Sequence, residues 1–186
     1  MSGMHEDERL DQTRRRWLRS ALCASACVVA GLREASATGT QEPAKRPPQP
    51  GDELAFPSWE HDGRLVHPDD LPSGAPPLLV YPRDPASGIV RERSRINQIL
   101  LLRPGADDAV IAFSGICTHA ACAVSEWNAE RRHFVCPCHA SEYDPLQRAK
   151  VVSGPAPRAL PALPVERRDD RYVIAGPFSA AIGATA

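Results

Sequence analysis

Aromatic residues are scarce in this chain, and neither sign of charge is in excess. Phe, Trp and Tyr make up 5% of the 186 residues, so a core must be built mainly from Leu, Val, Ile and Ala. Lys and Arg number 22 against 23 Asp and Glu, which leaves a formal net charge of -1. A chain without a basic excess has no general attraction for nucleic acid, so we expect no nucleic-acid partner.

The N-terminal region has no apolar run of membrane-spanning length. Its uncharged stretch, residues 20–32, has 13 residues, whereas a transmembrane helix needs about 20. Such a short stretch is typical of the apolar part of a secretory signal. The alternatives are a basic amphipathic helix, a lipoprotein attached at Cys27, and an uncleaved signal that stays in the inner membrane as an anchor.

A pair of arginines precedes this stretch. Residues 13–19 read Thr-Arg-Arg-Arg-Trp-Leu-Arg, which resembles a twin-arginine export signal with Arg14 and Arg15 as the pair. Ala37 closes a run of small residues of the kind that a signal peptidase reads. We therefore expect a signal peptide over residues 1–37 and a periplasmic location, because the twin-arginine route exports proteins that have already folded.

Proline and glycine are plentiful, with 19 Pro and 12 Gly, and this favours short strands between turns over long helices. Residues 38–51 are polar and Pro-rich, and we expect them to form a semi-extended linker. Short apolar runs then predict one all-β domain over residues 52–180 and a C-terminal tail over residues 181–186. The expected strands lie at residues 53–56, 78–81, 96–102, 109–113, 133–135, 151–152, 159–165 and 172–175.

The six cysteines fall into two groups, of which Cys23 and Cys27 lie in the N-terminal stretch. The other four fall within 22 residues and alternate with two histidines. In chain order these six residues are Cys117, His119, Cys122, Cys136, Cys138 and His139. Each half of the group combines a thiol with an imidazole at short spacing, which indicates metal-binding or disulfide chemistry.

Three kinds of site use such residues. Iron with bridging sulfide suits thiolates, and imidazole ligands on one iron raise the potential of a [2Fe–2S] centre. Structural zinc is an alternative, because two Cys and two His are a common zinc ligand set. Zinc fingers, however, pair like ligands and give no role to Cys122 and Cys138. A domain held only by disulfides would leave His119 and His139 unexplained.

Both loops resemble the cluster-binding loops of the Rieske family. The first reads Cys-Thr-His-Ala-Ala-Cys (residues 117–122), and the second reads Cys-Pro-Cys-His-Ala-Ser-Glu-Tyr (residues 136–143). Gly-Pro-Ala-Pro at residues 154–157 is similar to the family's later proline loop. The resemblance implies a Rieske fold, which is an antiparallel β-sandwich with a small cluster-binding subdomain of two loops. It also implies one [2Fe–2S] cluster as the cofactor.

The resemblance assigns a role to six side chains of these loops. The family uses two cysteines as ligands of one iron and two histidines as ligands of the other. It joins two further cysteines in a disulfide that ties the loops together. The implied ligands are Cys117, Cys136, His119 and His139, and the implied disulfide is Cys122–Cys138.

Two hydroxyl groups are implied to tune the cluster. In the family the residue at Ser141 donates to a bridging sulfide and the one at Tyr143 donates to the sulfur of Cys117. Such hydrogen bonds stabilise the reduced cluster and raise its potential. Ala121 and Ala140 stand where the family usually has Gly. If these positions need a positive φ, alanine costs about 1 kcal/mol at each.

These features together resemble the high-potential group of Rieske proteins, and we expect no catalytic domain with a mononuclear iron. Residues 80–82 and 111–119 are similar to the small subunit of arsenite oxidase, whereas residues 154–157 are more similar to the cytochrome bc type. The implied function is one-electron transfer as a subunit of a periplasmic or membrane-associated respiratory oxidoreductase. The partner would be a c-type cytochrome or a molybdenum dehydrogenase subunit. The alternative is quinol oxidation as the iron–sulfur subunit of a cytochrome bc-type complex (ubiquinol–cytochrome c reductase).

Overall fold

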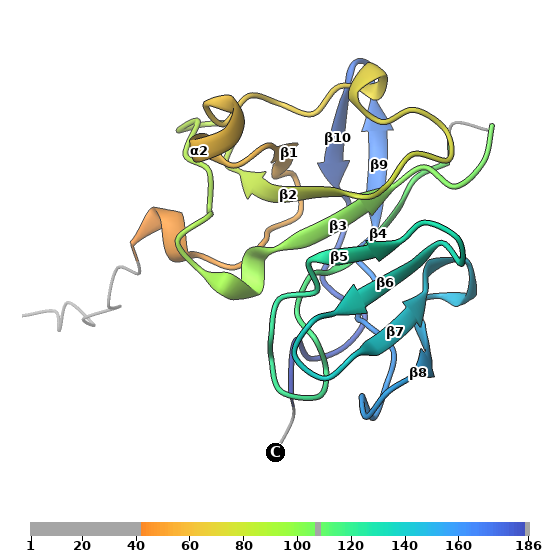
Figure 1. Ribbon diagram of the computed structural model, residues 1–186. Helices are drawn as coiled ribbons and strands as arrows, with labels where there is room; N and C mark the ends of the chain where they lie inside the picture. Colours follow the sequence, from red (N-terminus) through yellow and green to blue (C-terminus); the bar gives the residue numbers. More distant parts are fainter. Residues whose placement is uncertain (1–41, 107–108, 185–186) are drawn as a thin grey trace, which may run out of the picture. The chain divides into compact units, whose positions relative to one another are not determined.

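The structure, a computed structural model, describes residues 42–106 and 109–184 (Figure 1). Strands dominate this part of the chain, and its only α-helix is the single turn α2 (Ser58–His61), so the predicted all-β class is confirmed. None of the helices within the described ranges is both long and apolar enough to cross a membrane. The export signal predicted over residues 1–37 lies outside the described residues.

Two antiparallel sheets make up the described part of the chain. The larger sheet has the strand order β4-β3-β2-β1-β10-β9, and the smaller has the order β5-β6-β7-β8. The strands are β1 (Glu53–Ala55), β2 (Leu78–Arg83), β3 (Ile99–Leu102), β4 (Ile111–Ser114), β5 (Glu126–Asn128), β6 (His133–Cys136), β7 (Ser141–Asp144), β8 (Lys150–Ser153), β9 (Val165–Arg168) and β10 (Arg171–Ile174). The short 3-10 helices are η2 (Pro43–Lys45), η3 (Pro68–Asp70), η4 (Arg95–Asn97) and η5 (Pro145–Gln147).

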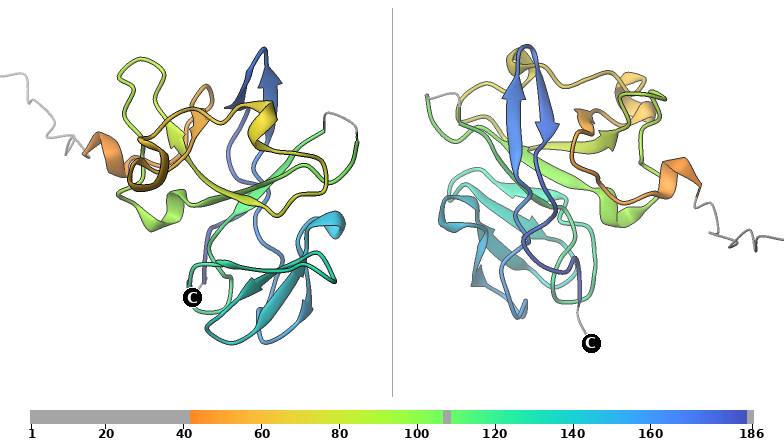
Figure 2. Two further views of the ribbon diagram at one scale, coloured as in Figure 1. Left: turned by 45° about the horizontal axis from the view of Figure 1, so that its top comes forward. Right: turned by 180° about the vertical axis from the view of Figure 1, so that it is seen from behind.

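Strand β3 joins the two hydrophobic cores. Its sequence Ile-Leu-Leu-Leu is buried at every position, and successive side chains of a strand point to opposite faces. Ile99 and Leu101 pack in the core of the larger sheet. Leu100 and Leu102 pack in a second core, which includes Phe134 of the smaller sheet. The smaller sheet lies beside β3 and β4 in every view (Figures 1 and 2). It is therefore supported by β3, a strand that is buried on both faces.

The strand expected over residues 96–102 begins only at residue 99, because the preceding residues form η4. Asn97 is fully buried within η4. Its side-chain amide donates to the carbonyl oxygens of Arg46 and Arg91, each at 2.7 Å. These hydrogen bonds come from a side chain and are not part of the backbone pairing of a sheet. They hold the chain in a turn before β3 begins.

The strand expected over residues 159–165 is also wrong over most of its length. Only residue 165 belongs to a strand, and Ala162 makes a single bridge to Phe113. Pro161 and Pro164 have no backbone N–H to donate to a ladder, which explains why the apolar run does not pair as a strand. Strands β5 and β7 were not expected, since both are short and β7 lies inside the second cysteine loop.

Residues 42–51, the described part of the expected linker, contact the domain along its surface. The backbone amide of Arg93 donates to the carbonyl of Ala44 at 3.1 Å, and that of Gly51 donates to the carbonyl of Ile174 at 2.8 Å. Together with the bond from Asn97 to Arg46, these contacts fasten the segment at both ends. Its composition is that of a linker, yet the domain binds its backbone at Ala44, Arg46 and Gly51.

Candidate metal centre

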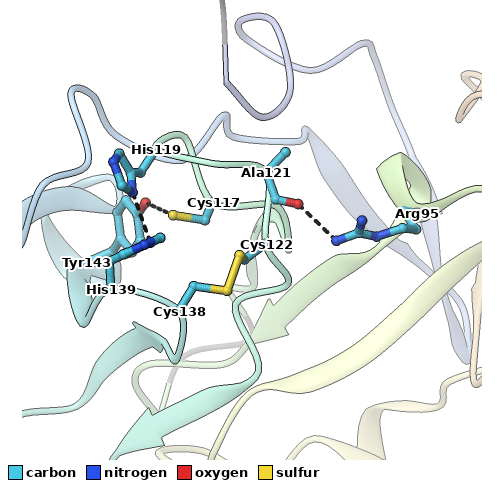
Figure 3. The surroundings of a disulfide bond; sticks show 8 residues. All are labelled: Arg95, Cys117, His119, Ala121, Cys122, Cys138, His139 and Tyr143. Atoms are coloured by element: carbon cyan, nitrogen blue, oxygen red, sulfur yellow. Dashed lines mark hydrogen bonds between the residues drawn. A yellow bond between two sulfur atoms is a disulfide. The ribbon is translucent and has the colours of Figure 1, made fainter.

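Two loops of similar backbone geometry form the site (Figure 3). The first follows β4, and the second connects β6 to β7. The amide of Ala121 donates to the carbonyl of Cys117 at 3.1 Å, and the amide of Ala140 donates to that of Cys136 at 3.0 Å. Each loop therefore closes a turn on the carbonyl of its own first cysteine. Both alanines have φ 54°, so the positions where glycine is usual do adopt the left-handed conformation.

A disulfide joins Cys122, the last residue of the first loop, to Cys138 within the second loop, and the two Cα atoms are 6.5 Å apart (Figure 3). The sulfur of Cys136 lies within 4.8 Å of both disulfide sulfurs. Three sulfur atoms this close can suggest a metal site, but the two in the disulfide are not thiolates and cannot act as such ligands. Of these three cysteines, Cys136 alone offers a thiol.

The two remaining thiols, Cys117 and Cys136, are free and buried. Burial opposes ionisation of Cys117, but hydrogen bonds from the Tyr143 hydroxyl and the backbone amide of His119 outweigh it and lower the pKa of the thiol. Burial raises the pKa of Cys136, and the charge of a neighbouring Cys117 thiolate raises it further. Hydrogen-bond donors around Cys117 therefore stabilise a negative charge on its sulfur.

The hydroxyl group of Tyr143 contributes to this stabilisation from the buried side of the site. Its side chain is fully buried, and its hydroxyl donates to the sulfur of Cys117 at 3.1 Å (Figure 3). Burial and the nearby Cys117 thiolate both raise the pKa of Tyr143, so the hydroxyl keeps its proton and remains a donor. The backbone amide of Thr118 donates to the same hydroxyl oxygen at 3.3 Å and fixes its direction.

The two imidazoles face each other at the surface. The Nδ1 atoms of His119 and His139 are 3.2 Å apart, with the rings nearly perpendicular at 87°. Two nitrogen ligands on one tetrahedral metal, at the usual bond length, lie about 3.4 Å apart. The side chain of His139 is exposed and that of His119 is partly exposed. The two rings therefore bring the same nitrogen atom close together, and both rings are more exposed than the two thiols.

The proline loop at residues 154–157 packs against the second loop. The amide of Ala156 donates to the hydroxyl oxygen of Ser141 at 3.1 Å, and Ser141 is fully buried. A Cβ added to Gly154, which has φ 85°, would lie 2.5 Å from the Cα of Ser141 and 2.8 Å from the carbonyl oxygen of Ala140. Glycine is thus required for this close approach.

Three residues near the site were not predicted from the sequence. Thr118 is buried, and its hydroxyl donates to the carbonyl of Arg158 at 2.6 Å, which links the first loop to the proline loop. Arg158 in turn donates to the carbonyl of Gly183 at 2.6 Å. Arg95 donates to the carbonyl of Ala121 at 2.9 Å. The position of Thr118 inside the motif could have indicated a role, but no local pattern marks either arginine.

The donor set fits a [2Fe–2S] centre. Two buried thiols and two outward imidazoles match the ligands that a cluster with histidines on one iron requires. The hydroxyl group of Tyr143 also lies against the sulfur of Cys117, where it donates a hydrogen bond. The profile of the Rieske [2Fe–2S] domain family matches residues 77–164, which contain both loops and the proline loop. Residues 77–164 form a Rieske [2Fe–2S] domain. A Rieske domain binds one [2Fe–2S] cluster.

Curated relatives of the Rieske domain come from respiratory enzymes. A protein of Haloferax mediterranei, named as a Rieske subunit of a respiratory nitrate reductase, is 38% identical over 135 residues. A cytochrome bc1 complex Rieske iron–sulfur subunit of Corynebacterium diphtheriae is 37% identical over 100 residues. These alignments cover 66% and 51% of this chain. They span 57% and 25% of the two relatives, so the chain matches only part of each.

Solved structures resemble the chain at low TM-scores. A cyanobacterial plasma membrane Rieske protein from Synechocystis has a TM-score of 0.38 and 26% identity, over 52% of this chain and 84% of that one. A chain of a hyperthermophilic respiratory Complex III has a TM-score of 0.41 and 17% identity, over 87% and 97%. At these scores the likenesses carry no further argument.

The packing of the proline loop predicts that Gly154→Ala destabilises the domain more than Gly51→Ala does. Both glycines have positive φ, but a Cβ at Gly51 would meet no atom within 4 Å. Gly51→Ala should therefore cost only the left-handed strain, about 1–2 kcal/mol of unfolding free energy. Gly154→Ala should cost about 1–3 kcal/mol more, from steric overlap with Ser141. Chemical denaturation of both variants measures the difference, and equal losses would contradict the close packing.

Proposed function

We propose that this chain is a one-electron-transfer subunit of a respiratory oxidoreductase, with its [2Fe–2S] cluster on four residues of the two loops. Cys117 and Cys136 would bind one iron, and His119 and His139 the other. The facing Nδ1 atoms of the two histidines, 3.2 Å apart on the outer side of two free thiols, support this assignment best. The disulfide supports it as well, because it removes the other two cysteines of the group from the choice of ligands.

The bound cluster supplies a site that accepts and releases one electron. Around it the protein provides fixed hydrogen-bond donors. Tyr143 donates to the sulfur of Cys117, and the oxygen of Ser141 accepts from Ala156, which leaves the Ser141 hydrogen available for a sulfur acceptor. Such donors stabilise the added negative charge of the reduced state. Because the ring of His139 is exposed, a redox partner protein can come close to the site.

The ligand assignment predicts that the folded protein carries two irons and two acid-labile sulfides. After reduction it should show the electron paramagnetic resonance signal of a cluster with mixed Cys and His ligands. Replacing His119 or His139 with Ala should abolish the signal. Replacing Cys122 and Cys138 together with Ser should leave iron bound in freshly prepared protein, since both lie outside the ligand set, but should make its loss faster. Stoichiometric zinc without labile sulfide would refute the assignment.

The hydrogen bonds to sulfur predict a lower potential in two variants. Tyr143→Phe removes the donor to Cys117, and Ser141→Ala removes a hydroxyl next to the proline loop. A hydrogen bond to a charged acceptor is worth about 1.5–3 kcal/mol, and only its difference between redox states counts. The potential should therefore fall by several tens of millivolts, on the order expected for this one-electron couple.

Protein-film voltammetry measures these potentials directly. Leu146→Ala is a suitable control, because this side chain is 59% exposed in η5 of the same subdomain and makes no part of the proposed hydrogen-bond set. The control should keep the wild-type potential. Potentials of Tyr143→Phe and Ser141→Ala that equal the wild-type value would show that the hydroxyl groups do not tune the cluster.

The surface around the histidines favours a partner that docks through uncharged groups. Besides His139, the exposed residues of the three loops are Ala120, Pro137, Cys138, Ala140, Gly154, Pro155 and Pro157. None of these side chains is charged, so docking there would depend weakly on ionic strength. The partner proposed first is a molybdenum dehydrogenase subunit or a c-type cytochrome, in keeping with the relative named for nitrate reductase.

Quinol oxidation within a cytochrome bc-type complex is the second candidate, and the relatives named as bc1 Rieske subunits favour it. Purification of the chain through a C-terminal tag, from the periplasm and from gently solubilised membranes, separates the two. A molybdenum subunit that copurifies supports the first candidate. A cytochrome b subunit that copurifies supports the second and contradicts the first.

We further propose that the chain reaches the periplasm by the twin-arginine route. Changing Arg14 and Arg15 to Lys should then leave cluster-containing protein in the cytoplasm. Mass spectrometry of the exported wild-type protein should find Thr38 as its first residue. A mature chain that keeps residues 1–37 in the inner membrane would contradict cleavage and favour an uncleaved anchor.

A further inference from the structure

One side chain from outside the cluster loops binds the first loop at its most strained residue. The guanidinium of Arg95 donates from Nη2 to the carbonyl oxygen of Ala121 at 2.9 Å (Figure 3). Arg95 is 26 residues away in the sequence and begins η4, ahead of β3 of the larger sheet. Ala121 lies directly before Cys122 of the disulfide and two residues after His119. The contact therefore reaches the loop between a disulfide cysteine and a proposed ligand.

The first loop needs support at this residue. Ala121 has φ 54°, a conformation that glycine adopts freely but that the Cβ of alanine disfavours. The amide of Ala121 is used in the turn with Cys117, which leaves its carbonyl as the remaining backbone group for an outside contact. A donor fixed on that carbonyl favours the strained conformation over the alternatives that would release it.

The element that carries Arg95 is itself well anchored. Asn97, two residues on, is fully buried and bonds to the carbonyls of Arg46 and Arg91. The carbonyl of Gln98 accepts from the amide of Gly115, just before the first loop, at 2.8 Å. The chain between Arg95 and Gln98 therefore meets the first loop on both sides of its ligands, from a rigid position.

The second loop has an alanine in the same left-handed conformation, but a different contact supports it. Ala140 has the same φ of 54° and the same turn onto its own first cysteine, Cys136. Here the backbone of Gly154 packs closely on the carbonyl oxygen of Ala140, where a Cβ on the glycine would approach to 2.8 Å. The two alanines thus form a matched pair with equal strain, of which Ala121 is the one that Arg95 contacts.

We propose that Arg95 is a positioning residue for the cluster: it holds the first loop in register by offsetting the left-handed strain of Ala121. The proposal rests on the proposed function, because the loop carries two of the proposed ligands. Its specific consequence is a compensation that couples Arg95 to Ala121 and not to Ala140. Glycine at residue 121 would remove the strain that the hydrogen bond from Arg95 offsets, so the two substitutions have opposite effects on the opening of the first loop.

A double-mutant cycle on the full chain tests this coupling. The variants are Arg95→Met, Arg95→Lys, Ala121→Gly and Ala140→Gly, together with Arg95→Met combined with each glycine change. Hydrogen exchange, measured by mass spectrometry on peptides of the first loop (residues 115–124) and the second loop (residues 136–143), reports the opening of each loop. The electron paramagnetic resonance spectrum of the reduced protein reports the cluster geometry.

Arg95→Met should speed exchange in the first-loop peptide about fivefold, the factor that corresponds to one modest hydrogen bond. It should leave the second-loop peptide and the midpoint of thermal unfolding unchanged, because Arg95 is exposed. It should also broaden the resonance spectrum, and Arg95→Lys should restore most of the wild-type behaviour. In the Arg95→Met background, Ala121→Gly should return exchange in the first-loop peptide to near the wild-type rate, whereas Ala140→Gly should not.

Two results would overturn the proposal. One is wild-type exchange and a wild-type spectrum in Arg95→Met. The other is first-loop exchange in Arg95→Met that Ala121→Gly slows no more than Ala140→Gly does, which would leave no specific compensation. Failure of the proposed function has a different signature, namely a wild-type protein without a cluster signal. The exchange cycle would still decide the role of Arg95 in that case.

Discussion

Convergence of two loops on one point is the constraint on which the site depends. Each loop closes on the carbonyl of its own first cysteine, and the bond between Cys122 and Cys138 then ties the loops to each other. Neither loop alone brings together two thiols and two imidazoles. The two sheets that carry the loops must therefore be held rigidly against each other. Strand β3 provides this rigidity, because its alternate residues pack into two different cores. The site is thus held by local turns, one covalent bond and a strand buried on both faces.

The thiols of the site are buried, whereas the His139 ring is exposed, and the two parts have different chemistry. The sulfurs of Cys117 and Cys136 lie inside, where Tyr143 can donate without competition from water. The ring of His139 lies outside among uncharged residues, where a partner can approach. A donor in a water-poor region acts strongly on the charge of the reduced state, while an exposed ring shortens the path to a partner. Under the proposed function, the same fold would supply both tuning and access.

Much of the site was predictable because its chemistry is local in sequence. Short spacing between thiol and imidazole identifies the loops, and the resemblance to the Rieske family supplied the pairing and the hydroxyl groups. The all-β class followed from short apolar runs between turns. The strand predicted at residues 159–165 was wrong because two prolines interrupt the apolar run, and proline has no backbone N–H to donate to a neighbouring strand. Arg95 and Arg158 could not be predicted, since each acts through backbone carbonyls far away in the chain and such contacts leave no sequence pattern.

The docked segment before β1 bears on how the domain meets its partners. Its composition suggests a flexible tether, but contacts with Arg93, with Asn97 in η4 and with Ile174 in β10 fasten residues 42–51 to the domain. A segment bonded at both ends moves with the domain, so a pivot for swinging between a donor and an acceptor cannot lie within it. The segment and the first cluster loop are also held by the same short stretch of chain, because Asn97 binds one and Arg95 binds the other. Pull on the N-terminal side of the domain would therefore act first on the contacts of Arg93 with Glu42 and Ala44, and next on Asn97 in η4, the element that also carries Arg95.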